Sequence, residues 1–455
     1  MATAGFYHAL KILTDVCIGC SHCMRVCPTE ALRVSEGKAH LLENRCIDCG
    51  ECYRVCPTHA ITVEQDDFTQ IFSYDHRIAL IPSVLLGQFP EDASREQVAQ
   101  ALLNIGFTSI IEVEDSVEYL IVKLNEYLRN NPNKPVISSF CPAIVRLVQV
   151  KFPSLVDNIA LVRPPLDLTA LYIKNSLTAQ GVPEDKIGIF YVTPCAAKIV
   201  AIRKPEGEEK SEITGIINMD FIYNRILHEV KHGIVPTEGA RVISELSPRS
   251  HTWALTTGES AHIEGRCLAI DGIWNAIEFL EKVENEEVSG IDFIELRACD
   301  ESCAGGILNP GNRFLAADAI RKNAGEVGLW NIDGISQKIK DYKERVGSQT
   351  GLQPLSPRSM LKLDEDMAHA MLKMKRVNRL MCYLPGIDCG VCGAPTCLSL
   401  AEDIVKGRGS VSQCVFLQKI MEQSKLDPSH SFRIMKKIWG VNRFRKDCDK
   451  PVSNK

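Results

Sequence analysis

The feature that most constrains this chain is its 19 cysteines, most of which are gathered toward its two ends. Eight lie between Cys17 and Cys56, six lie between Cys382 and Cys448, and five are spread over the middle. A chain of 455 residues can bury a hydrophobic core without disulfides, and a reducing cytosol would not preserve them. Clustered thiols in such a chain indicate metal ligands or redox groups.

Residues 1–65 contain an internal repeat. The run Cys-x2-Cys-x2-Cys-x3-Cys-Pro begins at Cys17 and recurs 29 residues later at Cys46. Each half is predicted to form a strand, a ligand loop, a short helical turn and a strand. The spacing is that of the bacterial two-cluster ferredoxin run, in which three thiolates of one loop and a fourth from the other repeat hold each 4Fe–4S cluster. The predicted ligand sets are Cys17, Cys20, Cys23 and Cys56 for one cluster, and Cys46, Cys49, Cys52 and Cys27 for the other. Paired zinc sites are the alternative, although zinc requires neither the third cysteine nor the Cys-Pro.

A different cysteine motif lies near the C-terminal end. Its four cysteines are Cys389, Cys392, Cys397 and Cys414. Gly386, Gly390 and Gly393 allow the backbone to approach a cluster closely. The spacing predicts a third 4Fe–4S cluster, with zinc as the alternative. The segment resembles the iron–sulfur domain of corrinoid iron–sulfur proteins and of the B subunit of the Rnf electron-transfer complex. The cysteines without partners at ligand spacing are interpreted as structural thiols: Cys267, Cys382 and Cys448.

The middle of the chain, from about 78 to 345, has an α/β pattern. Strands are predicted at 78–87, 108–114, 134–142, 186–195 and 291–299, and helices at 95–106 and 116–130. Strands that alternate with helices predict mostly parallel sheets, whose ligand sites lie beyond the carboxyl ends of the strands. Three of the predicted strands deliver a cysteine to that end: Cys141, Cys195 and Cys299.

The chain is therefore predicted to have several domains of α/β class overall. An α+β ferredoxin-like domain occupies 1–75, and an α/β domain occupies 76–345. A linker rich in Gly, Ser and Pro and a helix (364–380) fill 346–380. A small, mostly α iron–sulfur domain follows at 381–430, and a basic tail at 431–455.

Three motifs of the middle domain resemble the signature motifs of iron-only (FeFe) hydrogenases. They read SSFCPAIVR (138–146), TPCAAK (193–198) and RACDESCAGG (297–306). The resemblance implies an H-cluster, in which a 4Fe–4S cube is joined to a two-iron unit. The implied cube ligands are Cys141, Cys195, Cys299 and Cys303, with Cys303 also bridging to the two-iron unit. It further implies that Lys198 contacts a cyanide of that unit and that Pro82 and Ser83 line it. Scattered core thiols are the alternative interpretation.

Several positions depart from the family's motifs. In the family, a second cysteine that carries protons precedes the first cube ligand, and here this residue is Phe140. Arg297 stands where a methionine is usual, Ala201 where a glutamate is usual, and residues 300–302 replace the usual sequence between the last two ligands. These changes resemble the divergent branches of the family, which include sensory-like and less-studied groups.

The resemblance implies a cytoplasmic hydrogenase that interconverts H2 with protons and electrons and exchanges electrons with ferredoxin or another redox protein. Glu301, Asp300 and Ser139 are the candidates for a different proton route. The alternative is a redox-sensing or electron-transfer subunit with little or no H2 activity, and a third possibility is a scaffold within a multi-subunit oxidoreductase. The net charge of -5 disfavours nucleic-acid binding, and no apolar run is long enough to predict a membrane span.

Overall fold

The computed structural model of the chain describes residues 7–90, 93–233, 246–326, 332–358, 363–364 and 366–424. Helices and sheets alternate along it, which confirms the α/β class. The chain divides into two units, each built from discontinuous segments. The first unit comprises 1–11, 47–50 and 63–358, and the second comprises 12–46, 51–62 and 359–455.

The first unit contains two parallel sheets. The larger has the strand order β6 (Ser109–Glu112), β5 (His76–Ile81), β8 (Ile187–Thr193), β9 (Gly215–Asn218), and the smaller has the order β10 (Cys267–Ile270), β11 (Phe293–Leu296), β7 (Val136–Ile137). All seven residues of β8 are buried, as expected for a strand covered on both faces. The parallel arrangement confirms the prediction and brings the carboxyl ends of the strands in each sheet to one edge.

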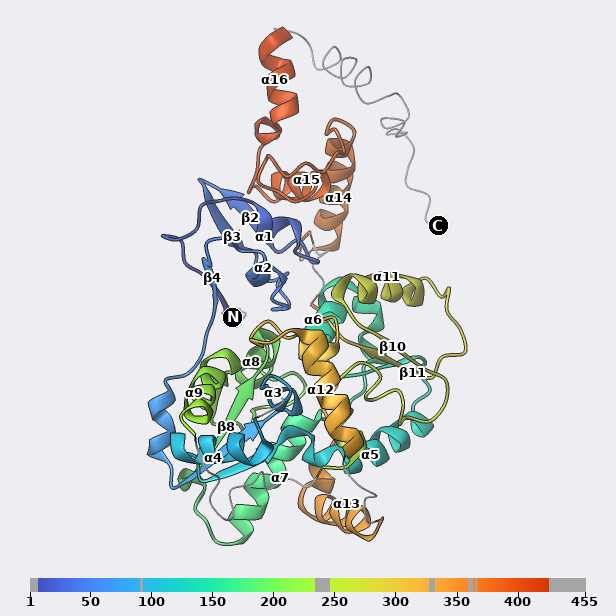
Figure 1. Cartoon of the computed structure of the whole chain (residues 1–455). Coiled ribbons are helices and arrows are strands. Elements are labelled where there is room, and N and C mark those ends of the chain that lie inside the picture. The colour runs from blue at the N-terminus through green and yellow to red at the C-terminus, as the bar shows by residue number, and fades with distance from the viewer. Residues whose placement is uncertain are drawn as a thin grey trace. The chain divides into compact units, whose positions relative to one another are not determined.

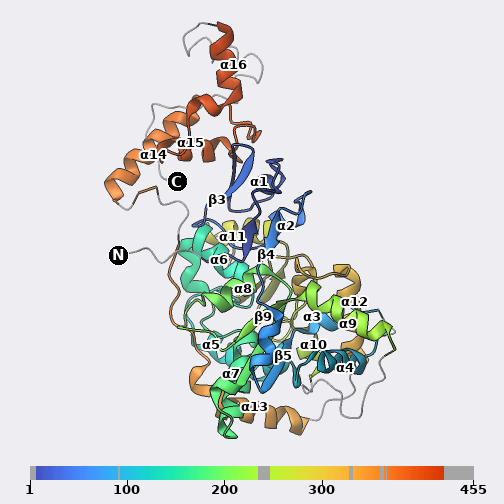
Figure 2. The ribbon, with the colours of Figure 1, turned by 90° about the vertical axis from the view of Figure 1, so that its left-hand side faces the viewer.

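Helices surround these two sheets. Their bounds are α3 (Ser83–Leu86), α4 (Arg95–Ile105), α5 (Val117–Asn130), α6 (Pro142–Lys151), α7 (Pro165–Ala179), α8 (Ala196–Arg203), α9 (Met219–Lys231), α10 (Pro248–Thr252), α11 (Ile273–Glu284), α12 (Arg313–Glu326) and α13 (Ile332–Val346). Helix α4 packs on α9, α12 on α3 and α10, and α13 on α5 and α7 (Figures 1 and 2). A capping box at Ser94 and Gln97 starts α4, and Gly106, with a φ of 123°, ends it. The helices predicted at 95–106 and 116–130 are confirmed.

The predicted strand at 78–87 is wrong beyond Ile81. Pro82 has no N–H to donate to a neighbouring strand, and the chain turns there into α3. The backbone N–H of Ser83 is instead bound by the carboxylate of Glu114, at 2.9 Å. The strand predicted at 108–114 ends at Glu112, where a 3-10 turn follows, and the one predicted at 134–142 is reduced to Val136–Ile137.

Residues 347–358, which the composition predicts as part of a linker, are held on the first unit by backbone hydrogen bonds. Thr350 O accepts from Arg163 N at 2.9 Å, and Gln353 N donates to Gly207 O at 2.8 Å. Further along, Arg358 N donates to the carbonyl of Gln149, also at 2.8 Å. This part of the segment therefore runs as a strap along the first unit, while the domain limits drawn from the sequence stay a prediction.

The second unit joins most of the N-terminal repeat to the C-terminal segment. It contains α1 (His22–Arg25), an antiparallel hairpin of β2 (Leu32–Ser35) and β3 (Lys38–Leu41), α2 (Glu51–Arg54), α14 (Met367–Met381), α15 (Cys397–Val405) and α16 (Val415–Ser424). Strands β1 (Leu10–Ile12) and β4 (Ile61–Val63) pair as a two-stranded sheet. Each repeat therefore runs strand, loop, short helix, strand, as predicted.

The C-terminal part of the second unit has a small core of its own. Helix α14 packs against α15, and Val377, Leu384, Leu400 and Ala401 are buried together there. The helix predicted at 364–380 is confirmed as α14. The basic tail predicted at 431–455 lies outside the described residues. Among the residues that are described, no helix is both long and apolar enough to cross a membrane.

Candidate functional site

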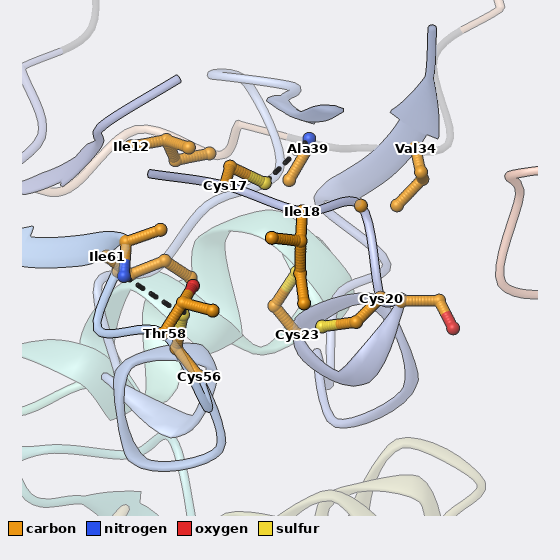
Figure 3. Close-up of a pocket in the computed structure, with 13 residues that line it drawn as sticks. Ile12, Cys17, Ile18, Cys20, Cys23, Val34, Ala39, Cys56, Thr58 and Ile61 are labelled. Carbon is orange, nitrogen blue, oxygen red and sulfur yellow. Dashed lines mark hydrogen bonds between the residues drawn. The ribbon is translucent and has the colours of Figure 1, made fainter. Parts of the chain in front are cut away.

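Four cysteines of the N-terminal repeat line one pocket of the second unit. They are Cys17, Cys20, Cys23 and Cys56, the first of the predicted ligand sets (Figure 3). The other walls are mostly apolar and include Ile18, Val34 and Ile61. Cys17, Cys20 and Cys23 come from the loop before α1 and from α1 itself, whereas Cys56 follows α2. The pocket therefore combines the two repeats in the way that the ferredoxin spacing predicts.

Backbone N–H groups point at the sulfurs of this pocket. Ala39 N donates to Cys17 Sγ at 3.4 Å, and Ala60 N donates to Cys56 Sγ at 3.2 Å. Although burial acts in the opposite direction, hydrogen bonds from the backbone lower the pKa of Cys56. Burial and the neighbouring thiols Cys20 and Cys17 raise the pKa of Cys23 to about 11. Crowded thiols with amide donors suit an iron–sulfur cluster, whose positive iron holds the sulfurs as thiolates and whose sulfurs accept N–H bonds.

The second predicted quartet is divided between the two units. Cys49 belongs to the first unit, whereas Cys27, Cys46 and Cys52 belong to the second, and their role as one ligand set stays a prediction. Cys27 Sγ accepts from Ala31 N at 3.1 Å, which repeats the arrangement at the equivalent Cys56.

The loop that carries Cys49 is anchored in the first unit by a buried ion pair. Asp48 contacts Arg146 of α6 at 2.8 Å and His8 at 2.7 Å. The side chains of Asp48 and Arg146 are at most 4% exposed.

The C-terminal cysteines also share a pocket of the second unit. Cys389, Cys392, Cys397 and Cys414 line it together with Val391 and Leu400. Gly390 and Gly393 have positive φ values of 74° and 83°, so the loop can turn tightly around its contents. Burial raises the pKa of Cys397, and hydrogen bonds from the backbone of Asp388 and Gly386 oppose this. These four thiols fit a cluster as the N-terminal set does.

The cysteines of the middle domain lie at the carboxyl ends of strands in both sheets of the first unit. Cys195 follows β8, Cys141 follows β7, and Cys299 and Cys303 follow β11. Burial raises the pKa of Cys195 to about 12, and the nearby Cys303 and Cys141 act in the same direction. Three strand ends therefore bring Cys141, Cys195 and Cys303 close enough to influence one another. Such a gathered set of half-buried thiols fits a metal cluster better than scattered core positions.

Lys198 is a buried cation beside these cysteines. It lies on the first turn of α8, and its Nζ is 3.7 Å from Cys303 Sγ and 4.8 Å from the centre of the Phe140 ring. Burial by itself lowers its pKa, but Cys303, Tyr191 and Cys195 more than reverse this, so the ammonium stays charged. A buried ammonium of this kind suits an anionic group held at Cys303.

Glu114 was missed by the sequence analysis and lies beside the predicted Pro82–Ser83 segment. Ser83 donates to its carboxylate from both N and Oγ, at 2.9 and 3.0 Å. Burial raises the pKa of Glu114 to about 6, against the effects of Ser83 and Lys198. The signal was available, because Glu114 follows β6 and Ser83 follows β5, and the two strands are parallel neighbours.

Two of the residues that depart from the family's motifs, Phe140 and Arg297, contact each other. The guanidinium carbon of Arg297 lies 3.8 Å from the centre of the Phe140 ring. Arg297 is 1% exposed and is paired with Glu259 at 3.0 Å and with Glu295 at 3.3 Å. Ser138 Oγ donates to Glu259 at 2.5 Å. Two buried cations, Arg297 and Lys198, therefore contact the ring of Phe140.

The candidates for another proton route are engaged with other groups. Asp300 pairs with Arg313 at 3.1 Å, and Glu301 pairs with Arg321 at 2.9 Å. Ser139 Oγ donates to the carbonyl of Val162 at 2.8 Å.

Two of the three predicted structural thiols lie among the described residues. Cys267 is a free thiol that donates to Ile263 O at 3.4 Å. Cys382 is disulfide-bonded, so its interpretation as a structural thiol is wrong in that its sulfur is not a thiol. Cys448 lies outside the described residues.

Comparisons with known proteins agree with this layout. Residues 77–223 match the family described as "Iron only hydrogenase large subunit, C-terminal domain". Residues 9–64 match the "4Fe-4S dicluster domain", and residues 384–416 match the family described as "Putative Fe-S cluster".

One curated relative is the NADP-reducing hydrogenase subunit HndD of Solidesulfovibrio fructosivorans, 24% identical over 208 residues. The match covers 43% of this chain and 32% of that protein, so the chain spans about a third of the relative's length. Solved structures that are similar include an FeFe-hydrogenase HydA(deltaEFG) and a single-residue variant of the FeFe-hydrogenase HydA1 of Chlamydomonas reinhardtii. Both structures are 14% identical to this chain, and each match covers 62% of this chain and 94% of the solved one. The TM-scores are 0.47 for the first and 0.45 for the second.

The fold and the cysteine sites define an iron–sulfur oxidoreductase. Over residues 77–223 the chain is similar to the iron-only (FeFe) hydrogenases, with a dicluster match before that part and an iron–sulfur match after it.

Proposed function

We propose that the chain is an FeFe hydrogenase that interconverts H2 with protons and electrons. The observation that carries the proposal is the environment of Cys303. Its sulfur faces the buried ammonium of Lys198 at 3.7 Å, beside Cys141 and Cys195 at the ends of parallel strands. A group that carries negative ligands would find its counter-ion there. The two-iron unit, when bound, would supply an open metal position for hydrogen.

The chain's own residues would hold this group and exclude water from it. Cys141, Cys195, Cys299 and Cys303 would hold the cube, and Lys198 would orient the anionic side of the two-iron unit. Ser83 and Glu114 form a buried hydroxyl–carboxylate pair at 3.0 Å. Because burial raises the pKa of Glu114 to about 6, this carboxyl can take up and release a proton near neutral pH. We propose Ser83 and Glu114 as the first members of the proton route.

The N-terminal and C-terminal cysteines would hold three further 4Fe–4S clusters that carry electrons to and from the middle domain. We propose a cytoplasmic ferredoxin or another small redox protein as the partner. HndD is by name a subunit of an NADP-reducing hydrogenase, which supports assembly with further subunits here.

A redox-sensing or electron-transfer subunit is the second candidate, and Phe140 favours it. The ring occupies the position where the resemblance implies a proton-carrying thiol, and a phenyl ring cannot titrate. Such a subunit would keep its clusters and show little or no H2 activity.

Infrared spectroscopy of protein purified without oxygen, after co-expression with maturation proteins, tests the proposal. Sharp bands from CO and CN ligands are expected, and the variant Cys303→Ala should lack them. Absence of these bands from the unaltered protein, at an iron content equal to four cubes, would exclude the hydrogenase and leave the electron-transfer subunit.

A further inference from the structure

Within the second unit, the C-terminal cysteine segment is bound to the first half of the N-terminal repeat. Arg33 of β2 forms an ion pair with Asp403 of α15, and Arg45 forms one with Glu402 of the same helix. The partners lie more than 350 residues apart in the sequence. All four side chains are at most 11% exposed. Buried, paired charges of this kind fix the relative position of two elements, because breaking one pair leaves an uncompensated charge.

The same contact continues at the N-terminal end of α15, beside the predicted ligand Cys397. Glu30 accepts hydrogen bonds from Ser399 Oγ and, at 3.3 Å, from Thr396 Oγ1. Arg45 Nη1 lies 3.6 Å from the same carboxylate. Glu30 is the third residue after Cys27 of the N-terminal repeat, and α15 begins at Cys397 of the C-terminal motif. The contact therefore joins the two cysteine motifs.

The loops that carry the residues lining the two cysteine pockets touch directly. Val34, which lines the pocket of Cys17, donates its N–H to Gly393 O at 2.9 Å. Gly393 lies between Cys392 and Cys397, and a Cβ on it would be 1.9 Å from Val34 O. A Cβ on Gly390 would likewise be 3.0 Å from the end of the Met24 side chain. Gly393 therefore allows the two loops to approach more closely than any side chain at that position would permit, whereas at Gly390 only the flexible end of Met24 would have to move.

We propose that this interface holds the C-terminal cluster beside the cluster of Cys17, Cys20, Cys23 and Cys56 as an interacting pair. The interface residues are Glu30, Arg33, Val34, Arg45, Gly393, Ser399, Glu402 and Asp403. The inference rests on the proposed clusters but not on H2 chemistry. It assigns the C-terminal segment a fixed place next to the first N-terminal cluster, rather than that of an independent domain.

Electron paramagnetic resonance of the fully reduced protein tests this inference. Two paramagnetic clusters that lie close together split and broaden each other's signals. We expect the signal of the first N-terminal cluster to be simpler in Cys414→Ser, which removes a ligand of the C-terminal cluster, than in the unaltered protein. Any interaction between the two N-terminal clusters persists in both samples and cancels in the comparison. Removal of the neighbouring negative cluster should also make the N-terminal cluster easier to reduce.

Arg33→Glu assigns the effect to the interface, because it places two carboxylates opposite each other at Asp403. We expect this variant to weaken the splitting while the iron content and the integrated signal stay unchanged. Arg33→Lys, which keeps the charge, should retain it. The matched control is Lys373→Glu, which breaks the ion pair between Lys373 and Asp364 (2.6 Å) in the same unit. Neither of these two residues belongs to the cysteine loops.

A spectrum of the unaltered protein that equals the sum of independent clusters would overturn the inference. So would an unchanged N-terminal signal in Cys414→Ser, or zinc in place of iron in the C-terminal pocket. Infrared bands measured on the same samples keep the two proposals apart. Absence of the bands together with a signal that becomes simpler in Cys414→Ser would refute only the hydrogenase. Presence of the bands together with a signal that Cys414→Ser leaves unchanged would refute only the cluster pair.

Discussion

Replacing Phe140 with cysteine would restore a thiol at the one position where the resemblance implies a proton carrier. The ring is 5% exposed, and two cations lie near its centre, Arg297 at 3.8 Å and Lys198 at 4.8 Å. Truncating a buried Phe costs about 3–5 kcal/mol, and a cysteine should fall near the lower limit because its sulfur refills part of the cavity. Loss of the contacts with the two cations adds about 1 kcal/mol. We therefore expect Phe140→Cys to lower the free energy of unfolding by about 4 kcal/mol.

The same change should raise the rate of H2 evolution. The two neighbouring cations lower the pKa of a thiol placed beside them, so it could exchange protons near neutral pH. A correctly placed acid–base group contributes about 10²–10⁴-fold to a rate, and we expect a gain of at least about 10²-fold if proton entry limits the unaltered protein. The assay is H2 evolution per infrared-detected active site, with a chemical reductant. Phe140→Ala is the control, because it opens a similar cavity without a titratable group.

Two results would refute this reasoning. Equal gains in Phe140→Cys and Phe140→Ala would show that water in the cavity carries the proton, so that the thiol has no role. No gain in Phe140→Cys, with the infrared bands intact, would show that protons do not enter past this position. The route through Ser83 and Glu114 would then be the one to test next.

Three further predictions follow from other buried groups. Burial raises the pKa of Glu114 from 4.5 to about 6, so the folded protein holds a proton that the unfolded chain releases. Glu114 alone should therefore lower the stability by about 2 kcal/mol as the pH rises from about 4.5 to above about 6. Glu114→Gln should remove this part of the pH dependence in denaturant unfolding of the metal-free protein. Cys20→Ala should lower the iron content by about one cube and keep the infrared bands, whereas Cys303→Ala should lose the bands; the reverse pattern would contradict the site assignment. Asp48→Asn removes the negative charge that faces the buried Arg146 and should cost about 3–5 kcal/mol in the free energy of unfolding; a cost below about 1 kcal/mol would show that the pair does not anchor the loop.

The sequence predicted those features that short-range spacing controls. The strand–loop–turn–strand order of both repeats, the helices that begin near Arg95 and Val117, and the parallel strands before the cysteines follow from local pattern and turn chemistry. The strand beyond Ile81 was wrong because a run of apolar residues looks the same in a buried strand and in a buried helix. The turn at Pro82 is decided by Glu114, a partner 31 residues away from Ser83 in the sequence.

Long-range partners were beyond sequence reasoning. Arg33 and Asp403 are each ordinary charged residues of their segments, and no local signal shows that they meet. Residues 347–358 were predicted to be part of a linker because they are rich in Gly, Ser and Pro. Composition does not show which hydrogen-bond partners a segment finds elsewhere in the chain. Hydrogen bonds from Arg163 and to Gly207 hold that segment in place. A composition rule cannot detect them.

Two departures from the family's motifs, Phe140 and Arg297, make physical sense together rather than as separate losses. A buried guanidinium at Arg297 is tolerated only with counter-charges, and Glu259 and Glu295 provide them at 3.0 and 3.3 Å. Once that cation is present, an aromatic face is a favourable neighbour for it, and Phe140 presents one at 3.8 Å. Restoring a thiol at 140 without changing Arg297 therefore gives a cysteine beside a cation, which favours the thiolate, whereas Arg297→Met alone would strand two buried carboxylates. The two positions should be strongly non-additive in both stability and pH dependence, because each determines the charge that the other must accommodate.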